Sequence, residues 1–145
     1  MKQEVQDLLK REIIHPNTSP YSASISVVEK KNRIIRICSA LIGLNVATID
    51  DRQPLPNMRE LMDAIAGAKY YSSWDLISEF WQIEIEEGDK TKTAFSTSWG
   101  HYKYNVMPFE LKGASATFQC LMTKVLGPYL YDFIMIYLDD IIIFS

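Results

Sequence analysis

The sequence predicts an α+β fold, and three observations support this prediction. Short β-branched runs and segments with helical spacing of apolar residues follow one another in mixed order, without the regular βαβα alternation that predicts a parallel sheet. The 145 residues suffice for one domain with a sizeable core. The composition, 48% hydrophobic and 23% charged, is typical of a globular protein and gives no sign of disorder.

The first part of the chain predicts a helix followed by a hairpin. Apolar residues at helical spacing predict a helix over 1–14, and the two prolines within 15–20 end it. Strands are expected over 24–28 and 33–38, with a turn at 30–32 between them. The hairpin carries a cationic cluster, formed by Lys30, Lys31, Arg33 and Arg36. Such a cluster is also typical of a solvated charged turn, and on the residues alone both interpretations stay open.

The next part predicts one helix between an extended connection and a strand. Residues 41–56 show little periodicity, which favours an extended connection. Asn57 has the position of a helix cap, and Gly67 is a natural end for the helix that follows. Residues 69–76 have the pattern of a strand, and this strand carries Asp75 near its end.

Three further elements precede the last apolar run. Residues 81–86 alternate between apolar and polar side chains, which predicts a half-exposed strand. A second hairpin is expected from 91–98 and 102–106. Ser115 can cap a helix that Gly127-Pro128 would end. The expected apolar stripe of this helix consists of Phe118, Leu121, Met122 and Val125.

Charge and cysteine content limit the classes of partner. The net charge is −3, with ten cations and eight acids over 1–74 and five cations and ten acids over 75–145. The total charge argues mildly against a nucleic-acid binder, whereas the early cationic cluster is more favourable. Cys38 and Cys120 match no zinc or disulfide framework, so a reducing intracellular setting is expected. No signal peptide is apparent, and the apolar run 133–144 is too short and too acidic to span a membrane.

That run, residues 133–144, is where the chemistry is expected. Asp139 and Asp140 interrupt an apolar, β-branched stretch, so a strand–turn–strand hairpin with the acids at the bend fits the pattern best. Two carboxylates between buried strands are unfavourable, because desolvation and like-charge repulsion both oppose ionisation. A divalent cation removes both penalties. An ordinary Asp-Asp turn with both side chains in water explains the stretch equally well.

Asp75 is the natural third member of such a site. It ends a predicted strand, and the intervening elements can bring that strand beside the Asp139-Asp140 hairpin. Three carboxylates could then hold two Mg²⁺ ions, since Mg²⁺ favours oxygen ligands. Phosphoryl-transfer enzymes hold two metals roughly 3.5–4 Å apart in this way.

Short motifs in a fixed order cover nearly the whole chain and end in Tyr137-Leu138-Asp139-Asp140. The others are Ser19-Pro20-Tyr21, Val27-Val28 with Lys30-Lys31, Leu44-Asn45, Pro54-Leu55-Pro56, Gly67-Ala68-Lys69-Tyr70, Asp75-Leu76, Trp81-Gln82-Ile83, Lys92-Thr93-Ala94-Phe95, Gly100-His101-Tyr102, Val106-Met107-Pro108-Phe109 and Ala116-Thr117-Phe118-Gln119. In this order they resemble the reverse transcriptases of gypsy-type long-terminal-repeat retrotransposons. One motif alone is a weak signal, whereas the ordered set is specific.

The resemblance implies a particular domain organisation. Residues of about 1–55 and 84–104 would form the fingers, and about 56–83 and 105–145 would form most of the palm. The palm would be an antiparallel sheet with helices packed on one face. The chain ends at Ser145, and the thumb, connection and RNase H domains of the family would lie beyond it.

The resemblance also implies a function and a metal site. The chain would be a fingers-and-palm fragment of an RNA-directed DNA polymerase, using Mg²⁺, or Mn²⁺ in its place. Asp75, Asp139 and Asp140 would bind the metals, with the Leu76 carbonyl as a further ligand. The implied partners are an RNA or DNA template with its primer, deoxynucleoside triphosphates and the remainder of a polyprotein, in a cytoplasmic particle or the nucleus.

Five further residues would contact the nucleotide or the primer. By the resemblance, Lys30 and Arg36 would grip the triphosphate of the incoming nucleotide. Phe80 would be the steric gate that excludes a ribose 2′-hydroxyl, although a plain core phenylalanine is the other interpretation. Phe109 would line the nucleotide pocket, and Tyr137 would lie against the primer end.

The chain also departs from the family pattern. Ser39-Ala40-Leu41-Ile42 replaces Val-Asp-Tyr-Arg, so the template-binding arginine is missing. Glu79 and Glu110 replace small residues, usually glycine, and Gly113 and Ser115 replace an asparagine and a proline. These changes motivate a rival hypothesis, a catalytically inactive retroelement remnant retained as a nucleic-acid- or protein-binding module. A metal-dependent nuclease lacks a residue to position water and ranks behind both.

Overall fold

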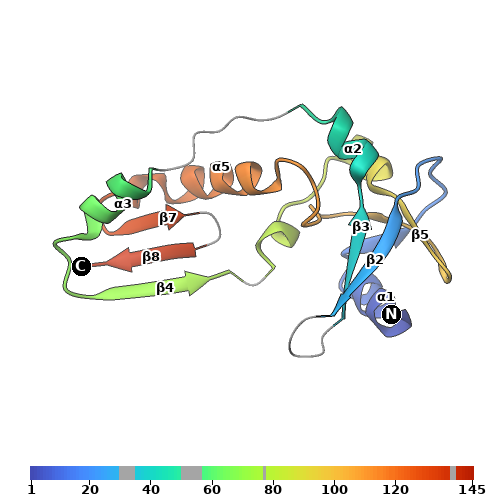
Figure 1. Ribbon diagram of the computed structural model, residues 1–145, viewed down its shortest axis with the longest axis horizontal. Coiled ribbons are helices and arrows are strands. Elements are labelled where there is room, and N and C mark those ends of the chain that lie inside the picture. The colour runs from blue at the N-terminus through green and yellow to red at the C-terminus, as the bar shows by residue number, and fades with distance from the viewer. Residues whose placement is uncertain (30–34, 50–56, 77, 138–139) are drawn as a thin grey trace. The chain divides into compact units, whose positions relative to one another are not determined.

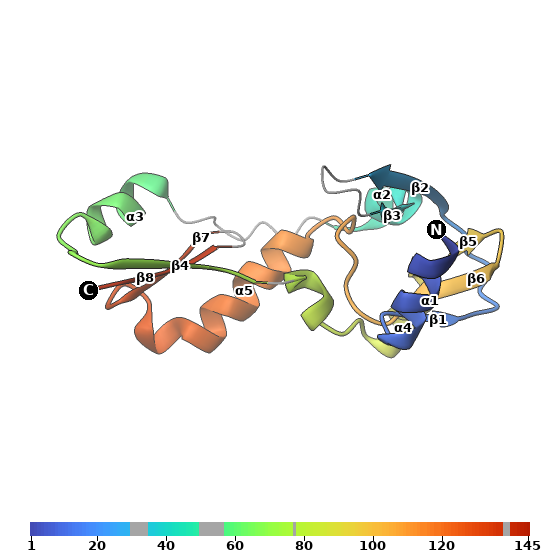
Figure 2. The same ribbon diagram turned by 90° about the horizontal axis from the view of Figure 1, so that it is seen from below.

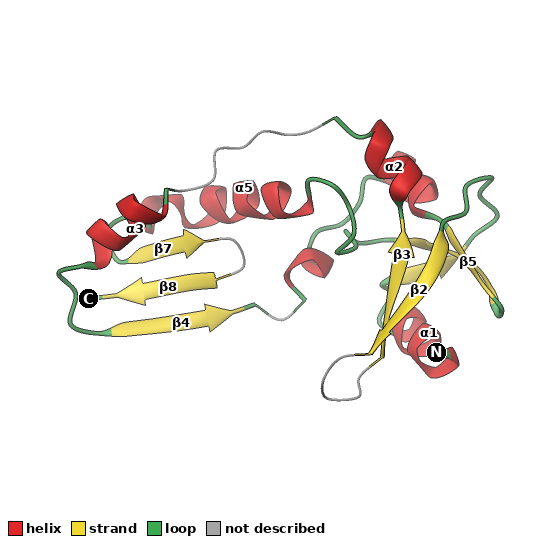
Figure 3. Cartoon of the chain, in the orientation of Figure 1, coloured by secondary structure: helices red, strands yellow, loops and turns green. Residues whose placement is uncertain are grey.

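The computed structural model describes residues 1–29, 35–49, 57–76, 78–137 and 140–145 (Figure 1). The side chains of Glu29, Ile35, Arg36 and Glu79 lie outside this description. The chain forms two compact units, each built from two segments: unit 1 comprises Met1–Ile49 with Phe80–Ala114, and unit 2 comprises Asp50–Glu79 with Ser115–Ser145. Both units combine antiparallel sheets with helices, which confirms the predicted α+β class (Figure 3).

Unit 1 is built on a three-stranded antiparallel sheet and a separate hairpin. Its elements are α1 (Lys2–Lys10), β1 (Ile14–Pro16), β2 (Ser24–Glu29), β3 (Ile35–Ala40), α2 (Ile42–Ala47), most of the 3₁₀ helix η1 (Glu79–Gln82), α4 (Glu87–Lys90), η2 (Thr91–Thr93), β5 (Phe95–Thr97) and β6 (Gly100–Tyr104). The sheet order is β1-β6-β5, and β2 pairs with β3. A bridge between Ala23 and Phe95 connects the hairpin to the sheet. Ile14 and Phe95 are fully buried at the centre of the core.

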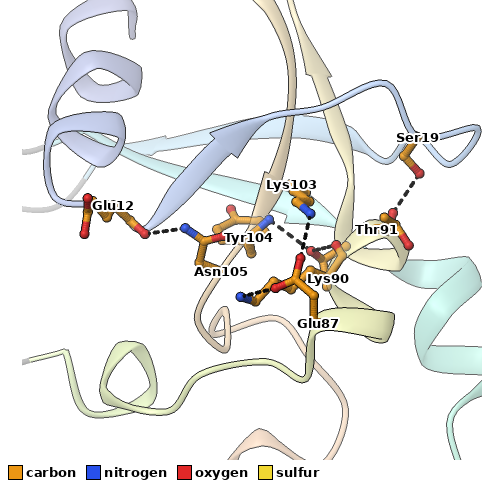
Figure 4. Close-up of polar contacts among 9 residues, drawn as sticks. Glu12, Ser19, Glu87, Lys90, Thr91, Lys103, Tyr104 and Asn105 are labelled. Carbon is orange, nitrogen blue, oxygen red and sulfur yellow. Dashed lines mark hydrogen bonds and ion pairs between the residues drawn. The ribbon is translucent and has the colours of Figure 1, made fainter.

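Side chains continue the hydrogen-bond pattern of this sheet where the strands end (Figure 4). The buried Thr93 hydroxyl donates to the Lys90 carbonyl oxygen at 2.7 Å and accepts from the Tyr104 N–H at 3.0 Å. Asn105 donates from its side chain to the Glu12 carbonyl oxygen at 2.8 Å. Hydrogen bonds from Lys90 and Lys103 lower the pKa of the exposed Glu87 carboxyl.

Helix α1 ends in a tight left-handed turn. The Ile13 N–H donates to the Leu8 carbonyl and the Glu12 N–H to the Leu9 carbonyl, both at 3.0 Å. Glu12 lies between these bonds with φ of 58°, a conformation that glycine adopts more easily. The helix therefore ends at Lys10, four residues before the end of the predicted 1–14 span, and Ile14 begins a strand.

Unit 2 is a three-stranded antiparallel sheet with a helix on each face. Its elements are α3 (Met58–Ile65), β4 (Tyr71–Asp75), α5 (Ala114–Leu126, all but its first residue), η3 (Gly127–Tyr129), β7 (Ile134–Tyr137) and β8 (Asp140–Phe144). The strand order is β4-β8-β7. As expected, Asn57 caps α3, and its side chain accepts a hydrogen bond from the Arg59 N–H at 3.0 Å.

The two helices of unit 2 pack on opposite faces of the sheet (Figure 2). Met122 and Leu126 of α5 contact Ile134, Ile136 and Ile141. On the other face, Leu61 of α3 contacts Met135 and Phe144. The expectation that helices cover one face is therefore wrong in this respect, because both faces carry apolar residues of strand β8.

Three other expectations differ from the structure. Residues 42–47 form α2 rather than an extended connection, and 81–86 form part of η1 and an isolated bridge at Glu84 rather than a strand. In α5, Leu121 and Val125 are exposed, because the buried side is formed by Phe118, Gln119 and Met122. Within the described residues, no helix is both long and apolar enough to cross a bilayer.

Candidate active site

Strands β4 and β8 of unit 2 lie side by side (Figure 1), and their register makes Asp75 and Asp140 direct partners. Partner residues in an antiparallel pair have side chains on the same face of the sheet, with Cβ atoms about 4.5–5.5 Å apart. Tyr137 is the partner of Asp140 on the other side, in β7. The register therefore places Asp75, Asp140 and Tyr137 in one row across the sheet, the acid row. This row contains two of the three predicted acids and the tyrosine predicted to contact the primer.

The apolar pattern of the strands explains why this register forms. Ile134, Ile136 and Ile141 are buried against the α5 face, whereas Met135 and Phe144 are buried against the α3 face. A shift by one residue would move each of these side chains to the wrong face. Burial of the isoleucines thus determines which residue of β8 lies beside Asp75.

Leu76 and α3 complete the surroundings of the acids. Leu76 is partly buried and packs against the cluster of Ile134, Ile136 and Ile141, which anchors the chain directly after Asp75. On the α3 face, Tyr137 and Asp140 line an apolar hollow together with residues of α3 and neighbouring strands: Met58, Leu61, Met62, Ile65, Met135 and Ile142. One side of the acid row is therefore apolar.

The acid pair fits a divalent cation. Both carboxylates are exposed, and among the described residues neither forms a salt bridge with a lysine or arginine. Like charges directly opposite each other in a sheet destabilise it, and an oxygen-binding cation would remove this repulsion. No cluster of three or more metal-binding side chains occurs within the described residues, and the third predicted acid, Asp139, lies outside them.

The predicted nucleotide-binding residues divide between the two units, with Phe80, Phe109 and the backbone of Arg36 in unit 1 and Tyr137 in unit 2. Phe80 is buried, with 6% of its surface exposed, and the Phe109 ring meets it edge-on at 5.4 Å between centroids. The backbone of Arg36 pairs with Val28 in the β2–β3 hairpin. The side chain of Arg36 and the whole of Lys30 lie outside the described residues.

Sequence reasoning missed one member of this aromatic group. Trp81 meets Phe109 at 5.3 Å between ring centroids, and the guanidinium of Arg11 lies 5.1 Å from the Trp81 ring. The alternation of residues 81–86 indicated a strand, whereas Trp81 belongs to η1. The adjacent aromatic pair Phe80-Trp81 was the available signal, since two neighbouring rings can both reach a third ring from a tight helical turn.

One or two carboxylates, together with substrate phosphates, commonly hold Mg²⁺ in phosphoryl-transfer enzymes such as kinases and polymerases. The comparisons with known proteins give the class more closely. The sequence profile described as "Reverse transcriptase (RNA-dependent DNA polymerase)" matches residues 23–145. The chain belongs to this family.

Individual relatives agree with the family assignment. The chain is 42% identical to the "Retrovirus-related Pol polyprotein from transposon 297" of Drosophila melanogaster, over 100% of its own length and 14% of that polyprotein. It is 38% identical to the corresponding polyprotein from transposon gypsy of the same organism, over 98% of its length and 14% of the relative. It is also 39% identical, over 77% of its length, to 78% of an "RNA-directed DNA polymerase homolog" of Oenothera berteroana. The chain thus spans about a seventh of the transposon polyproteins that it matches.

Solved structures share the fold. A foamy viral protease-reverse transcriptase in complex with double-stranded DNA matches 99% of the chain with a TM-score of 0.88 and 22% identity, over 25% of that chain. The same kind of enzyme in complex with an RNA/DNA hybrid gives a TM-score of 0.83, also at 22% identity, over 99% of this chain and 19% of that one. These matches show that the chain shares the fold of these proteins.

Proposed function

We propose that this chain carries the nucleotidyl-transfer centre of an RNA-directed DNA polymerase from a retrotransposon polyprotein. The observation that carries the proposal is the register that makes Asp75 and Asp140 cross-strand partners. Membership in the reverse transcriptase family supports the same chemistry. The reaction is in-line attack of a primer 3′-hydroxyl on the α-phosphate of a deoxynucleoside triphosphate, with loss of pyrophosphate.

The acids hold the metal ions in this proposal. Asp75, Asp139 and Asp140 supply carboxylate oxygens, and the Leu76 carbonyl supplies one more ligand. Reverse transcriptases use divalent metals, and the oxygen-only ligand set suits Mg²⁺, with Mn²⁺ in its place. When bound, such metals lower the pKa of an attacking hydroxyl and stabilise the leaving oxygens.

The remaining proposed residues bind and select the substrate. Lys30 and Arg36 grip the triphosphate, since guanidinium and ammonium groups both bind phosphate oxygens. Phe80 excludes a ribose 2′-hydroxyl, and Phe109, whose ring lies edge-on to Phe80, lines the nucleotide pocket. Tyr137 lies in the acid row and contacts the primer end.

The proposed partners follow from this reaction. The template is RNA or DNA with a paired primer, and the substrates are deoxynucleoside triphosphates. The foamy viral enzymes, solved with double-stranded DNA and with an RNA/DNA hybrid, support a duplex partner for this fold. The chain spans about a seventh of the transposon polyproteins that it matches. This supports the proposal that it acts as one part of a longer protein.

Primer extension tests the proposal. The chain would be assayed on a primed RNA template with Mg²⁺ or Mn²⁺, beside the variants Asp75→Asn and Asp139→Asn. Loss of incorporation in both variants is expected, because each replaces a charged metal ligand by a neutral amide. Asp63→Asn is the matched control, since it changes an exposed carboxylate of α3 in the same unit.

Two outcomes would contradict the proposal. Incorporation that survives Asp139→Asn would exclude the named acids from the chemistry. A folded chain that binds metal in isothermal titration, but shows neither incorporation nor nucleotide-dependent enhancement of that binding, would favour the inactive binding module instead.

A further inference from the structure

Helix α2 of unit 1 has an unusual distribution of side chains. Ile42 and Val46 are 70% and 80% exposed, and Ile49 just beyond the helix is 90% exposed. Leu44 and Asn45 are partly buried, Leu41 at the N-terminal end of the helix is buried, and Asn45 forms hydrogen bonds with another segment. The helix is therefore attached to its unit through a polar side chain as well as through two leucines.

Asn45 holds the segment that follows Phe109 with both ends of its amide group. Its Nδ2 donates to the Glu110 carbonyl oxygen at 2.8 Å, and its Oδ1 accepts from the Lys112 N–H at 2.7 Å. The Lys112 Nζ also donates to the Thr48 carbonyl oxygen at 3.3 Å, at the C-terminal end of α2. Three hydrogen bonds, together the clamp, thus attach residues 110–112, the clamped segment, to Asn45 and Thr48.

The geometry of the amide group explains why this contact fixes position. A side-chain amide offers one donor and one acceptor in a plane, which matches a carbonyl and an N–H two residues apart on another backbone. Glu110 is not among the residues with positive φ, so this backbone segment accommodates a side chain where the family usually has glycine. Gly113, in contrast, has φ of 85° and ends the clamped segment just before α5.

The clamped segment determines where the Phe109 ring lies. Pro108 before it is fully buried, and residues 110–112 after it are bound to α2. Between these two anchors, the Phe109 ring meets Phe80 at 5.4 Å and Trp81 at 5.3 Å. Release of one anchor would allow the ring to leave both partners.

From these contacts we infer that Asn45 is a positioning residue, which holds Phe109 against Phe80 and thereby shapes the nucleotide pocket. The inference about the nucleotide rests on the proposed function, whereas the clamp itself does not. Asn45→Ala removes both hydrogen bonds. Asn45→Asp keeps the acceptor for the Lys112 N–H but places a negative oxygen against the Glu110 carbonyl.

Amide hydrogen exchange measures the clamp directly. In Asn45→Ala, exchange of the Lys112 amide should become roughly threefold to tenfold faster, which corresponds to the loss of about one net hydrogen bond. In Asn45→Asp, that amide should stay protected, because its acceptor is retained. Asn105→Ala is the matched control, since it removes a comparable side-chain bond to the Glu12 carbonyl elsewhere in unit 1. Unchanged exchange in Asn45→Ala would overturn the inference.

Trp81 fluorescence measures the ring position without any enzymatic activity. In a background of Trp74→Phe and Trp99→Phe, both at exposed positions, Trp81 is the remaining tryptophan. Both Asn45 variants should shift its emission, because Phe109 would move away from it, whereas Asn105→Ala should not. An unaltered Trp81 signal with faster Lys112 exchange would overturn the positioning role and leave only the clamp.

Single-nucleotide incorporation then connects the ring to the substrate. Both Asn45 variants should raise the KM for the deoxynucleotide by roughly fivefold with kcat changed less than about twofold, the pattern of lost substrate binding. An unchanged KM would overturn the role in the pocket. If the unsubstituted chain incorporates nothing, the proposed function fails, and the exchange and fluorescence results decide on the positioning of Phe109 by themselves.

Discussion

Asp75 and Asp140 face each other across two antiparallel strands. Among the described residues, neither forms an ion pair with a lysine or an arginine. Two like charges in this arrangement weaken the sheet, so the acids that serve the proposed chemistry lower the stability of unit 2. The pair therefore connects the stability of unit 2 with the proposed metal binding.

The first prediction follows from this repulsion. In the presence of a chelator, Asp75→Asn should raise the free energy of unfolding by about 0.5 kcal/mol, because it removes one of two opposed charges. Added Mg²⁺ should stabilise the unsubstituted chain through preferential binding to the folded state, and should stabilise Asp75→Asn much less. Urea unfolding with and without Mg²⁺ measures both effects. An equal response to Mg²⁺ in both proteins would contradict a cation shared by these carboxylates.

The second prediction concerns alkaline pH and the buried Tyr104. Burial raises the pKa of Tyr104 above its ordinary value of 10.0, and the negative charge of Glu110 raises it further, whereas the hydrogen bond with Ser39 opposes the rise. Because the pKa is raised in the folded state, the stability from this group is complete below about pH 10 and is lost as the pH rises beyond it. The free energy of unfolding should therefore fall steadily above pH 10.

Tyr104→Phe isolates this contribution. Near neutral pH the variant should lose about 1–3 kcal/mol, because the buried Ser39 hydroxyl, 3.0 Å from the Tyr104 hydroxyl, is left without its partner. Above pH 10 its free energy of unfolding should fall less steeply than that of the unsubstituted chain. Parallel pH profiles for the two proteins would mean that Tyr104 titrates as it does in the unfolded chain.

The third prediction concerns the left-handed turn after α1. Glu12→Gly should raise the free energy of unfolding by about 1 kcal/mol, because glycine adopts the positive φ without steric conflict. Glu12→Ala separates backbone strain from side-chain effects, since alanine retains the strain and should give no comparable gain. Thermal unfolding of the three proteins measures the order of stability, and a glycine variant no more stable than the alanine variant would be inconsistent with strain at this position.

The fourth prediction concerns Thr93, whose hydroxyl replaces a strand hydrogen bond. Thr93→Val should lower the free energy of unfolding by about 1–3 kcal/mol, because the Tyr104 N–H and the Lys90 carbonyl both lose a partner in the core. Thr93→Ser should recover much of this loss, since it restores the hydroxyl. Chemical denaturation ranks the variants, and a serine variant as unstable as the valine variant would assign the effect to packing instead.

Much of the fold could be predicted from local patterns. Asn57 and Gly67 bracket α3 because helix ends have specific chemical requirements. The strands around Asp139 and Asp140 were predictable because β-branched runs bounded by a turn have few other conformations. The family could be recognised from the sequence because many short motifs occur in one fixed order, and such an ordered set is specific.

Other features depend on distant contacts that no local pattern records. Helix α2 exposes most of its apolar side chains, and Asn45 binds it to residues 65 and 67 positions away. The 81–86 alternation correctly gave the exposed positions Gln82, Glu84 and Glu86, yet the backbone there is mostly not a strand. For the candidate site, the meeting of Asp75 with Asp140 was predicted in outline, whereas its exact register depended on which isoleucines α5 buries.

The pairing of β4 with β8 limits the number of residues that can be inserted into or deleted from β4, because successive side chains alternate between the two faces of the sheet. Removal of a single residue between Tyr71 and Asp75 would turn the carboxylate toward the α5 side of the sheet, whereas removal of two would return it to its present side. Odd-numbered insertions and deletions in this strand should therefore be absent from active members of the family, while even-numbered ones can survive.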